Sequence, residues 1–159
     1  PRAVLQMVIQ ADQKDFKACV GGYKVQHQET KKIVLNLLPR YKFQIAINPG
    51  IWRWGFRHES IEDSPFPHIR MGEDQVFLVN SGVLGSERIL FTENIFYTYF
   101  TGADGQLTSK RRMNKALVES LIEIARFSVR ASFLEQFYRL LVALRIGLTL
   151  VKRIVSGKK

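Results

Sequence analysis

The sequence has very little of what marks secreted, membrane-spanning or disordered chains. Its 159 residues include one cysteine, Cys19, so no disulfide can form within the chain, which favours a reducing compartment. The most apolar stretch, residues 137–155, is interrupted by four Lys or Arg and is too charged for the ~20-residue apolar run that a spanning helix needs. Hydrophobic residues make up 46% of the chain, which excludes disorder. We therefore expect a single domain over residues 1–159 that does not span a membrane.

Catalytic and metal-binding motifs are missing as well. The chain contains no HExxH, CxxC, P-loop, GxSxG or GxGxxG pattern. Its only cluster of acids and histidines falls in the proline-bearing segment 59–72 and just before it, and consists of His58, Glu59, Glu62, Asp63 and His68. We interpret this cluster as a solvated loop. The sequence thus predicts a protein that is not an enzyme and that needs no cofactor or metal.

Positive charge is abundant and unevenly distributed. The net charge is +10, and residues 106–159 carry twelve Lys or Arg against three Glu. Residues 59–105 are acidic, with eight Asp or Glu against two Arg, whereas residues 1–58 are again basic. An uneven field of this kind attracts polyanions or anionic lipid surfaces. The expected partner is RNA or another polyanion, with peripheral membrane contact as an alternative.

Alternation of apolar and polar residues dominates the first hundred residues and predicts short strands. We expect these strands at residues 4–10, 23–28, 32–38, 41–47, 51–57, 75–80, 88–92, 94–101 and 106–112, with a hairpin loop over 102–105. The period then changes to 3.6 and predicts helices over 114–131 and 133–155. Strands followed by helices indicate an α+β fold. Residues 1–112, mainly β, are expected to form an antiparallel barrel or sandwich of about 7–9 strands, covered by two C-terminal helices.

The two predicted helices differ in their surfaces. The charged residues of the first share one stripe and are expected to pair with one another in solvent: Lys115, Glu119, Glu123, Arg126 and Arg130. The main apolar face of the second is expected to contact the core or a partner: Phe137, Leu140, Leu141, Leu144, Leu148, Val151 and Val155. A further patch lies on the other side of this helix: Arg139, Val142, Ile146, Leu150 and Arg153. One small sheet cannot cover both surfaces, so this patch is predicted to bind a partner.

Two segments are candidates for nucleic-acid contact. If residues 51–57 form a strand, Trp52 and Trp54 share one face with Phe56 while Arg53 and Arg57 share the other. Exposed aromatic rings can stack on unpaired bases and arginines can bind phosphates, but the same alternation is typical of a strand covered by a helix. The cluster Lys110, Arg111 and Arg112 would either hold phosphates or protect a sheet edge from pairing.

These observations predict a basic RNA-binding subunit of a larger assembly. The alternative is a structural or assembly subunit of a membrane-bound mitochondrial complex that docks through its last helix. A start at Pro1 is what a removed organelle presequence leaves, and also what trimming leaves. We therefore expect a location in the mitochondrial matrix or at the periphery of the inner membrane, or otherwise within the cell.

Overall fold

The structure is a computed structural model. It describes residues 5, 8, 9, 12, 14–48, 50–64, 66–69, 72–101, 110–126 and 131–157. Its strands are β1 (Ala18–His27), β2 (Ile33–Leu37), β3 (Trp54–Phe56) and β4 (Ile89–Thr101). Its α-helices are α2 (Lys42–Ile47), α3 (Glu73–Asn80), α4 (Lys110–Arg126) and α5 (Phe133–Ser156), and short 3-10 helices lie at η1 (Ile51–Arg53), η2 (His58–Ser60) and η3 (Val83–Gly85).

Strand β1 is the centre of one open, mixed sheet. Along one side it pairs antiparallel with β3 through its first residues and with β2 through its last ones, where Ala18 faces Phe56 and Tyr23 faces Leu37. Along its other side it pairs parallel with β4. Residues that are paired in register on neighbouring strands place their side chains on the same face of the sheet. Tyr23 of β1 is paired with Tyr97 of β4, so the two side chains lie next to each other on one face.

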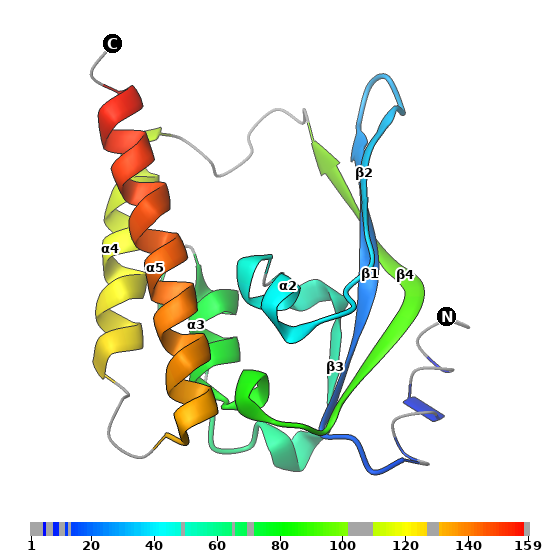
Figure 1. The fold of residues 1–159 in the computed structure, drawn as a ribbon. Coiled ribbons are helices and arrows are strands. Elements are labelled where there is room, and N and C mark those ends of the chain that lie inside the picture. The colour runs from blue at the N-terminus through cyan, green and yellow to red at the C-terminus, as the bar shows by residue number, and fades with distance from the viewer. Residues whose placement is uncertain are drawn as a thin grey trace.

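Strand β4 bulges beside a pair of glycines in β1. Between the pairs Val20–Phe91 and Tyr23–Tyr97, β1 advances by three residues and β4 by six. The extra residues of β4 bring the ring of Phe96 over Gly21, where a Cβ atom would overlap it. A bulge of this kind bends a strand and increases its twist. Figure 1 shows β4 bending away from β1 at this level and approaching it again above.

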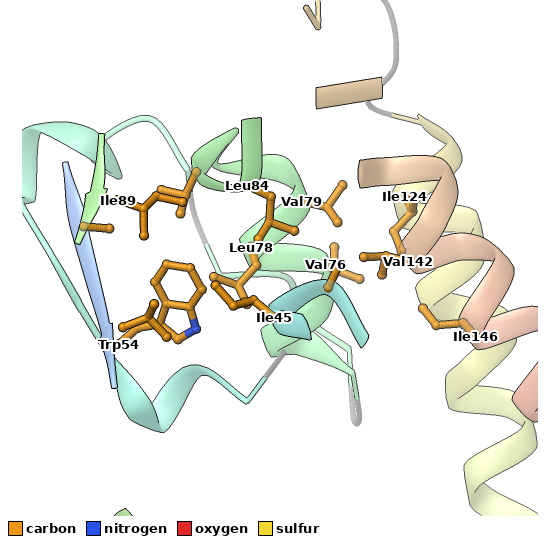
Figure 2. Packing of buried hydrophobic residues seen from close by; sticks show 14 of the residues in the cluster. Ile45, Trp54, Val76, Leu78, Val79, Leu84, Ile89, Ile124, Val142 and Ile146 are labelled. Atoms are coloured by element: carbon orange, nitrogen blue, oxygen red, sulfur yellow. The ribbon is translucent and has the colours of Figure 1, made fainter. Parts of the chain in front are cut away.

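The helices form two layers on one side of the sheet. Helices α2 and α3 lie next to the sheet, and the α4–α5 pair lies beyond them (Figure 1). Figure 2 shows the continuous core between these layers, from Ile89 and Trp54 on the sheet side, through Leu78 and Val76, to Val142 on α5. The four apolar residues at 76–79 are all buried, so α3 is surrounded by protein on every side.

The expected antiparallel barrel or sandwich of 7–9 strands is wrong. The described residues form four strands in one open mixed sheet, and helices lie between these strands in the sequence. Two expected strands are helices. Segment 75–80 lies in α3, because an apolar run that is buried on all sides has no periodicity to separate strand from helix. Segment 41–47 lies in α2, which buries the adjacent residues Ile45 and Ala46 rather than alternate ones.

Three further segments differ from the expected strands. Leu5, Val8 and Ile9, the described residues of segment 4–10, are helical. Segment 51–57 divides into the 3-10 helix η1 and the three-residue strand β3. Residues 110–112 begin α4, and the expected hairpin loop and the rest of segment 106–112 lie outside the described residues. The strands expected at 23–28 and 32–38 are confirmed as parts of β1 and β2, and the two strands expected at 88–92 and 94–101 form the single strand β4.

Both C-terminal helices are confirmed. Helix α4 begins four residues before Asn114, the expected cap, so Asn114 lies within the helix. Helix α5 begins after Ser132, whose hydroxyl accepts a hydrogen bond from the backbone N–H of Glu135, while the Glu135 carboxylate accepts one from the backbone N–H of Ser132. This reciprocal pair satisfies two donors of the first turn. None of the helices that the structure describes is long and apolar enough to cross a membrane.

Candidate functional site

Helices α4 and α5 form an antiparallel hairpin that is joined by hydrogen bonds at two levels. Close to the C-terminal end of α4, Arg139 donates from Nη1 to the backbone oxygen of Ile124 at 2.7 Å. Toward the far end, Arg153 donates from Nε to Oδ1 of Asn114 at 3.0 Å. The first turns of α4 therefore lie beside the last turns of α5, as Figure 1 also shows.

Two basic segments that are far apart in the sequence meet at this end of the hairpin. We call it the basic end, and it comprises Lys110, Arg111, Arg112, Lys115, Lys152 and Arg153. The Lys115 side chain is 83% exposed and lies 3.8 Å from Glu119, its partner one turn on. No Asp or Glu follows Glu135 in the sequence, so α5 brings only positive charge to this end. Of the described side chains at this end, those of Lys115 and Lys152 are exposed, and clustered positive charge of this kind attracts anions.

Aromatic side chains from three elements form a second feature, on the sheet face nearer the helices. We call this the aromatic surface, and its members are Tyr23, Trp52, Tyr97 and Tyr99. Trp52 of η1 stacks on Tyr97 at 4.6 Å between ring centroids and on Tyr99 at 6.1 Å. It meets Tyr23 edge-on at 4.6 Å. Tyr97 and Tyr99 keep 39% and 38% of their surface exposed, so a ligand can reach them.

Two arginines lie at the border of the aromatic surface. The Arg53 guanidinium is buried 5.2 Å from the centre of the Tyr23 ring and donates to the backbone oxygen of Asn48. Arg145 of α5 donates from Nη1 to Oε1 of Gln75 at 2.7 Å. Burial lowers the pKa of both arginines, and the interaction of each with Tyr23 opposes this effect. Both guanidiniums are therefore poorly solvated cations next to a tyrosine.

Asp74 is the acid coupled to Arg145. Burial raises the pKa of its carboxyl, Glu73 raises it further, and hydrogen bonds from the backbone N–H groups of Gln75 and Ile51 lower it. Its interaction with Arg145 acts in the same lowering direction but is the smallest contribution. Asp74 in turn is the largest influence that opposes the effect of burial on the pKa of Arg145.

The tryptophan–arginine segment does not form one site. Trp54 is 9% exposed and stacks on Phe56 with ring centroids 5.5 Å apart, and Figure 2 shows it within the core. The core interpretation is thus correct for Trp54, whereas Trp52 belongs to the aromatic surface. Arg57 binds the N-terminal segment instead, with Nη2 3.3 Å from the Asp12 carboxylate and Nε donating to the backbone oxygen of Phe16 at 2.9 Å.

The structure reverses the expected roles of the two faces of α5. Val142 and Ile146, predicted to bind a partner, are fully buried, and Arg139 is 8% exposed. Figure 2 shows Val142 near Val76 of α3. Leu150 is partly buried against the same core, and Arg153 contacts Asn114. Helices α3 and α4 pack against α5 and cover this patch, and α3 contains residues 75–80, one of the expected strands.

Most of the main apolar face of α5 is exposed instead, whereas Leu141, which was expected on this face, is partly buried against the core. We call the exposed residues, together with Phe133, the apolar stripe: Phe133, Phe137, Leu140, Leu144, Leu148, Val151 and Val155. Their exposed fractions run from 47% at Phe137 to 86% at Phe133. A groove of about 360 Å³ between α4 and α5 adjoins the stripe, with Leu121, Ala125, Gln136, Leu140 and Ala143 among its lining residues. Single exposed apolar residues are ordinary, but a continuous stripe is a candidate interaction surface.

The predicted charged stripe of α4 is confirmed where the structure describes it. Lys115 pairs with Glu119, and Arg126 lies 3.0 Å from Glu123, while Arg130 falls outside the described residues. The backbone of Lys110 to Arg112 is helical, so these residues do not lie at a sheet edge. Among the described residues no three His, Cys, Asp or Glu side chains could together hold a metal ion.

Sequence reasoning missed the residues that complete the aromatic surface. Tyr97 and Tyr99 alternate along β4, a signal that was present in the sequence. Their proximity to Tyr23 depends on the parallel pairing and the bulge, and the position of Arg145 depends on how α5 packs, so neither could be inferred from local periodicity. Comparisons of the chain with protein-family models, with curated proteins and with solved structures gave no match.

Proposed function

We propose that the chain is a non-enzymatic subunit of a larger assembly and that it binds RNA through the basic end of the α4–α5 hairpin. The observation that carries this proposal is the convergence of two basic segments on one end of the hairpin, where Arg153 is bonded to Asn114. Phosphate neutralisation by Lys and Arg releases counter-ions and supplies most of the sequence-independent affinity for nucleic acid. Single-stranded or irregular RNA fits this arrangement better than duplex DNA, because none of the described helices is placed as a reader of the major groove.

Salt dependence tests the proposal. Replacing Lys110, Arg111 and Arg112 with Ala should weaken binding to all RNAs alike and reduce the slope of log affinity against log salt by about 2, at ~0.7 per phosphate contact on single strands. Lys152→Ala, on the other helix, should reduce the slope further by about 0.7 if both segments meet one RNA. Fluorescence anisotropy of labelled RNA at several salt concentrations measures both effects.

The control removes charge elsewhere. Lys32 and Arg40 are exposed on the segments that flank β2, and their joint replacement with Ala should leave the slope unchanged. If the control and the basic-end variants lose affinity equally, the charge effect is not local. If neither changes the slope, the basic end does not bind RNA.

A second candidate function, docking to a protein partner, is favoured by the apolar stripe. Its residues recur every three or four positions over 133–155, which spans about 33 Å of helix and matches the seam of a helix pair. The adjoining groove and Gly147, where a Cβ would meet no atom within 4 Å, leave room for a neighbouring backbone. The geometry therefore fits an apolar helix of another protein.

Other occupants of the stripe are less favourable. Helices that lie on membranes carry Lys and Arg along both flanks of the apolar face, whereas here Lys152 is the only flanking charge on the exposed side. A second copy of the chain would bring a further net charge of +10. Replacing Leu144 and Leu148 with Glu should detach the chain from its native assembly without lowering its melting temperature. Normal co-sedimentation of this double variant would reject docking through the stripe, and loss of binding to anionic vesicles alone would indicate lipid instead.

A further inference from the structure

We infer that the aromatic surface binds an unpaired nucleotide, with the base on Tyr97 or Tyr99 and the phosphate near Arg145. This inference rests on the proposed RNA binding and assigns a second contact region to it. The surface combines the exposed rings of Tyr97 and Tyr99 with adjacent guanidiniums, which are components of single-strand recognition.

The rings are placed for stacking on more than one base. Tyr97 and Tyr99 are two positions apart on β4, which corresponds to a distance of about 7 Å along the strand. Trp52 packs against both and orients them, with centroid distances of 4.6 Å and 6.1 Å. Each tyrosine still exposes more than a third of its surface, so a base can stack where Trp52 does not cover the ring.

The charges at the border select an anionic ligand. Aromatic clusters also bind ammonium groups, but Arg53 already lies over the Tyr23 ring and would repel a second cation. The Nε atom of Arg53 is buried and has no hydrogen-bond partner, so a nearby phosphate would stabilise this guanidinium. Asp74, the acid coupled to Arg145, is itself destabilised as a carboxylate by burial. A nucleotide has both of the groups that this surface can bind. Its planar base can stack on the tyrosine rings, and its phosphate can interact with the arginines.

The aromatic surface and the basic end lie within reach of one strand. Arg145 precedes Arg153 by eight residues on α5, which corresponds to about 12 Å along the helix axis. Both side chains are partly buried on the side of α5 that faces the rest of the domain. An RNA strand of a few nucleotides that is held at the basic end can therefore place a base on the sheet face.

Binding of single-stranded and duplex RNA of equal length separates stacking from charge. Anisotropy of a labelled oligouridylate should show that Tyr99→Ala weakens binding about 5- to 100-fold, the range of one lost base stack. Tyr99→Phe should retain most of the affinity because it keeps the ring. Affinity for the duplex, whose bases are not available for stacking, should stay within twofold of wild type.

Tyr41→Ala is the matched control, because Tyr41 is 65% exposed and lies outside the aromatic surface. Circular dichroism should show every variant folded, and Tyr97→Ala provides a second test if Tyr99→Ala does not fold. If both tyrosine variants bind the oligouridylate as wild type does, the aromatic surface is not the site and RNA binding through the basic end still stands. If wild-type protein binds neither RNA, both the inference and the proposed function are wrong.

Discussion

Arg153 and Asn114 are 39 positions apart in the sequence, and a hydrogen bond of 3.0 Å from the arginine Nε to the asparagine Oδ1 joins them. The bond fixes the last turns of α5 beside the first turns of α4. Together with the bond from Arg139 to the backbone oxygen of Ile124 and the packing of α4 on α5, it keeps the two basic segments at one level. This contact is therefore part of the structural basis of the basic end.

Asn114→Ala should lower the free energy of unfolding by about 1–2 kcal/mol, because the variant removes one partly buried hydrogen bond to a charged group. Urea unfolding followed by circular dichroism measures the change. Asn114→Asp keeps an acceptor oxygen and should lose less stability. Equal losses in the two variants would show that the amide contributes through packing rather than through this bond.

Truncation of a side chain should lower the stability of the chain on one face of α5 and leave it almost unchanged on the other. Ile146→Ala should cost about 2–5 kcal/mol, since it empties a fully buried position. Leu148→Ala, two residues on and 62% exposed, should change the stability of the isolated chain by no more than about 0.5 kcal/mol. Thermal or urea unfolding of the pair tests this. A large loss for Leu148→Ala alone would mean that the apolar stripe packs within the domain.

Two glycine substitutions should have effects of opposite sign. Gly147→Ala places a Cβ on a helix position with no atom within 4 Å and should stabilise the chain by about 0.5–1 kcal/mol through helix propensity. Gly21→Ala should destabilise it, because the new Cβ would overlap the Phe96 ring and lie 2.9 Å from the backbone oxygen of Asn94. Melting temperatures of both variants check the result. An unaffected Gly21→Ala variant would contradict the bulge of β4 over β1.

Cys19 should make the stability of the chain fall at alkaline pH. Its thiol is 3% exposed, and burial raises its pKa from 9.0 to about 11. The unfolded chain ionises first, so wild type loses about 2–3 kcal/mol between pH 9 and pH 11 relative to its stability below pH 9. Cys19→Ser lacks this titration, and the difference in unfolding free energy between the two proteins isolates it. A difference that does not change with pH would show that the thiol is accessible to water.

The sequence predicted the parts of the fold that local signals determine. The 3.6-residue period identified α4 and α5, and alternation identified β1, β2 and β4. Alternation failed at 41–47, where a short helix buries neighbouring rather than alternate residues, and the apolar run 76–79 has no period at all. Both errors replaced helices of the middle layer with strands and, together with the differences at 4–10, 51–57 and 110–112, they led to the barrel or sandwich that the structure contradicts.

The candidate site was predictable only in its composition. The basic clusters at the start of α4 and at the end of α5 are visible in the sequence, but their convergence requires the antiparallel packing of the two helices. Likewise, the sequence shows two apolar faces on α5 and cannot decide which one α3 and α4 cover. Val142 and Ile146 form the smaller apolar patch but have the better fit to the core, so the longer stripe is left exposed.

Photo-crosslinking of RNA to the full chain, followed by mass spectrometry of the linked peptides, tests the central claim most directly. The account predicts crosslinks at two places: peptides that contain residues 110–115 or 152–153 at the basic end, and peptides that contain Trp52, Tyr97 or Tyr99. Raising the salt concentration should reduce both sets together, because one strand contacts both regions. The account would be contradicted by crosslinks confined to Arg57 and the N-terminal segment around Asp12. It would also be contradicted if no crosslinks formed at concentrations where the chain is folded.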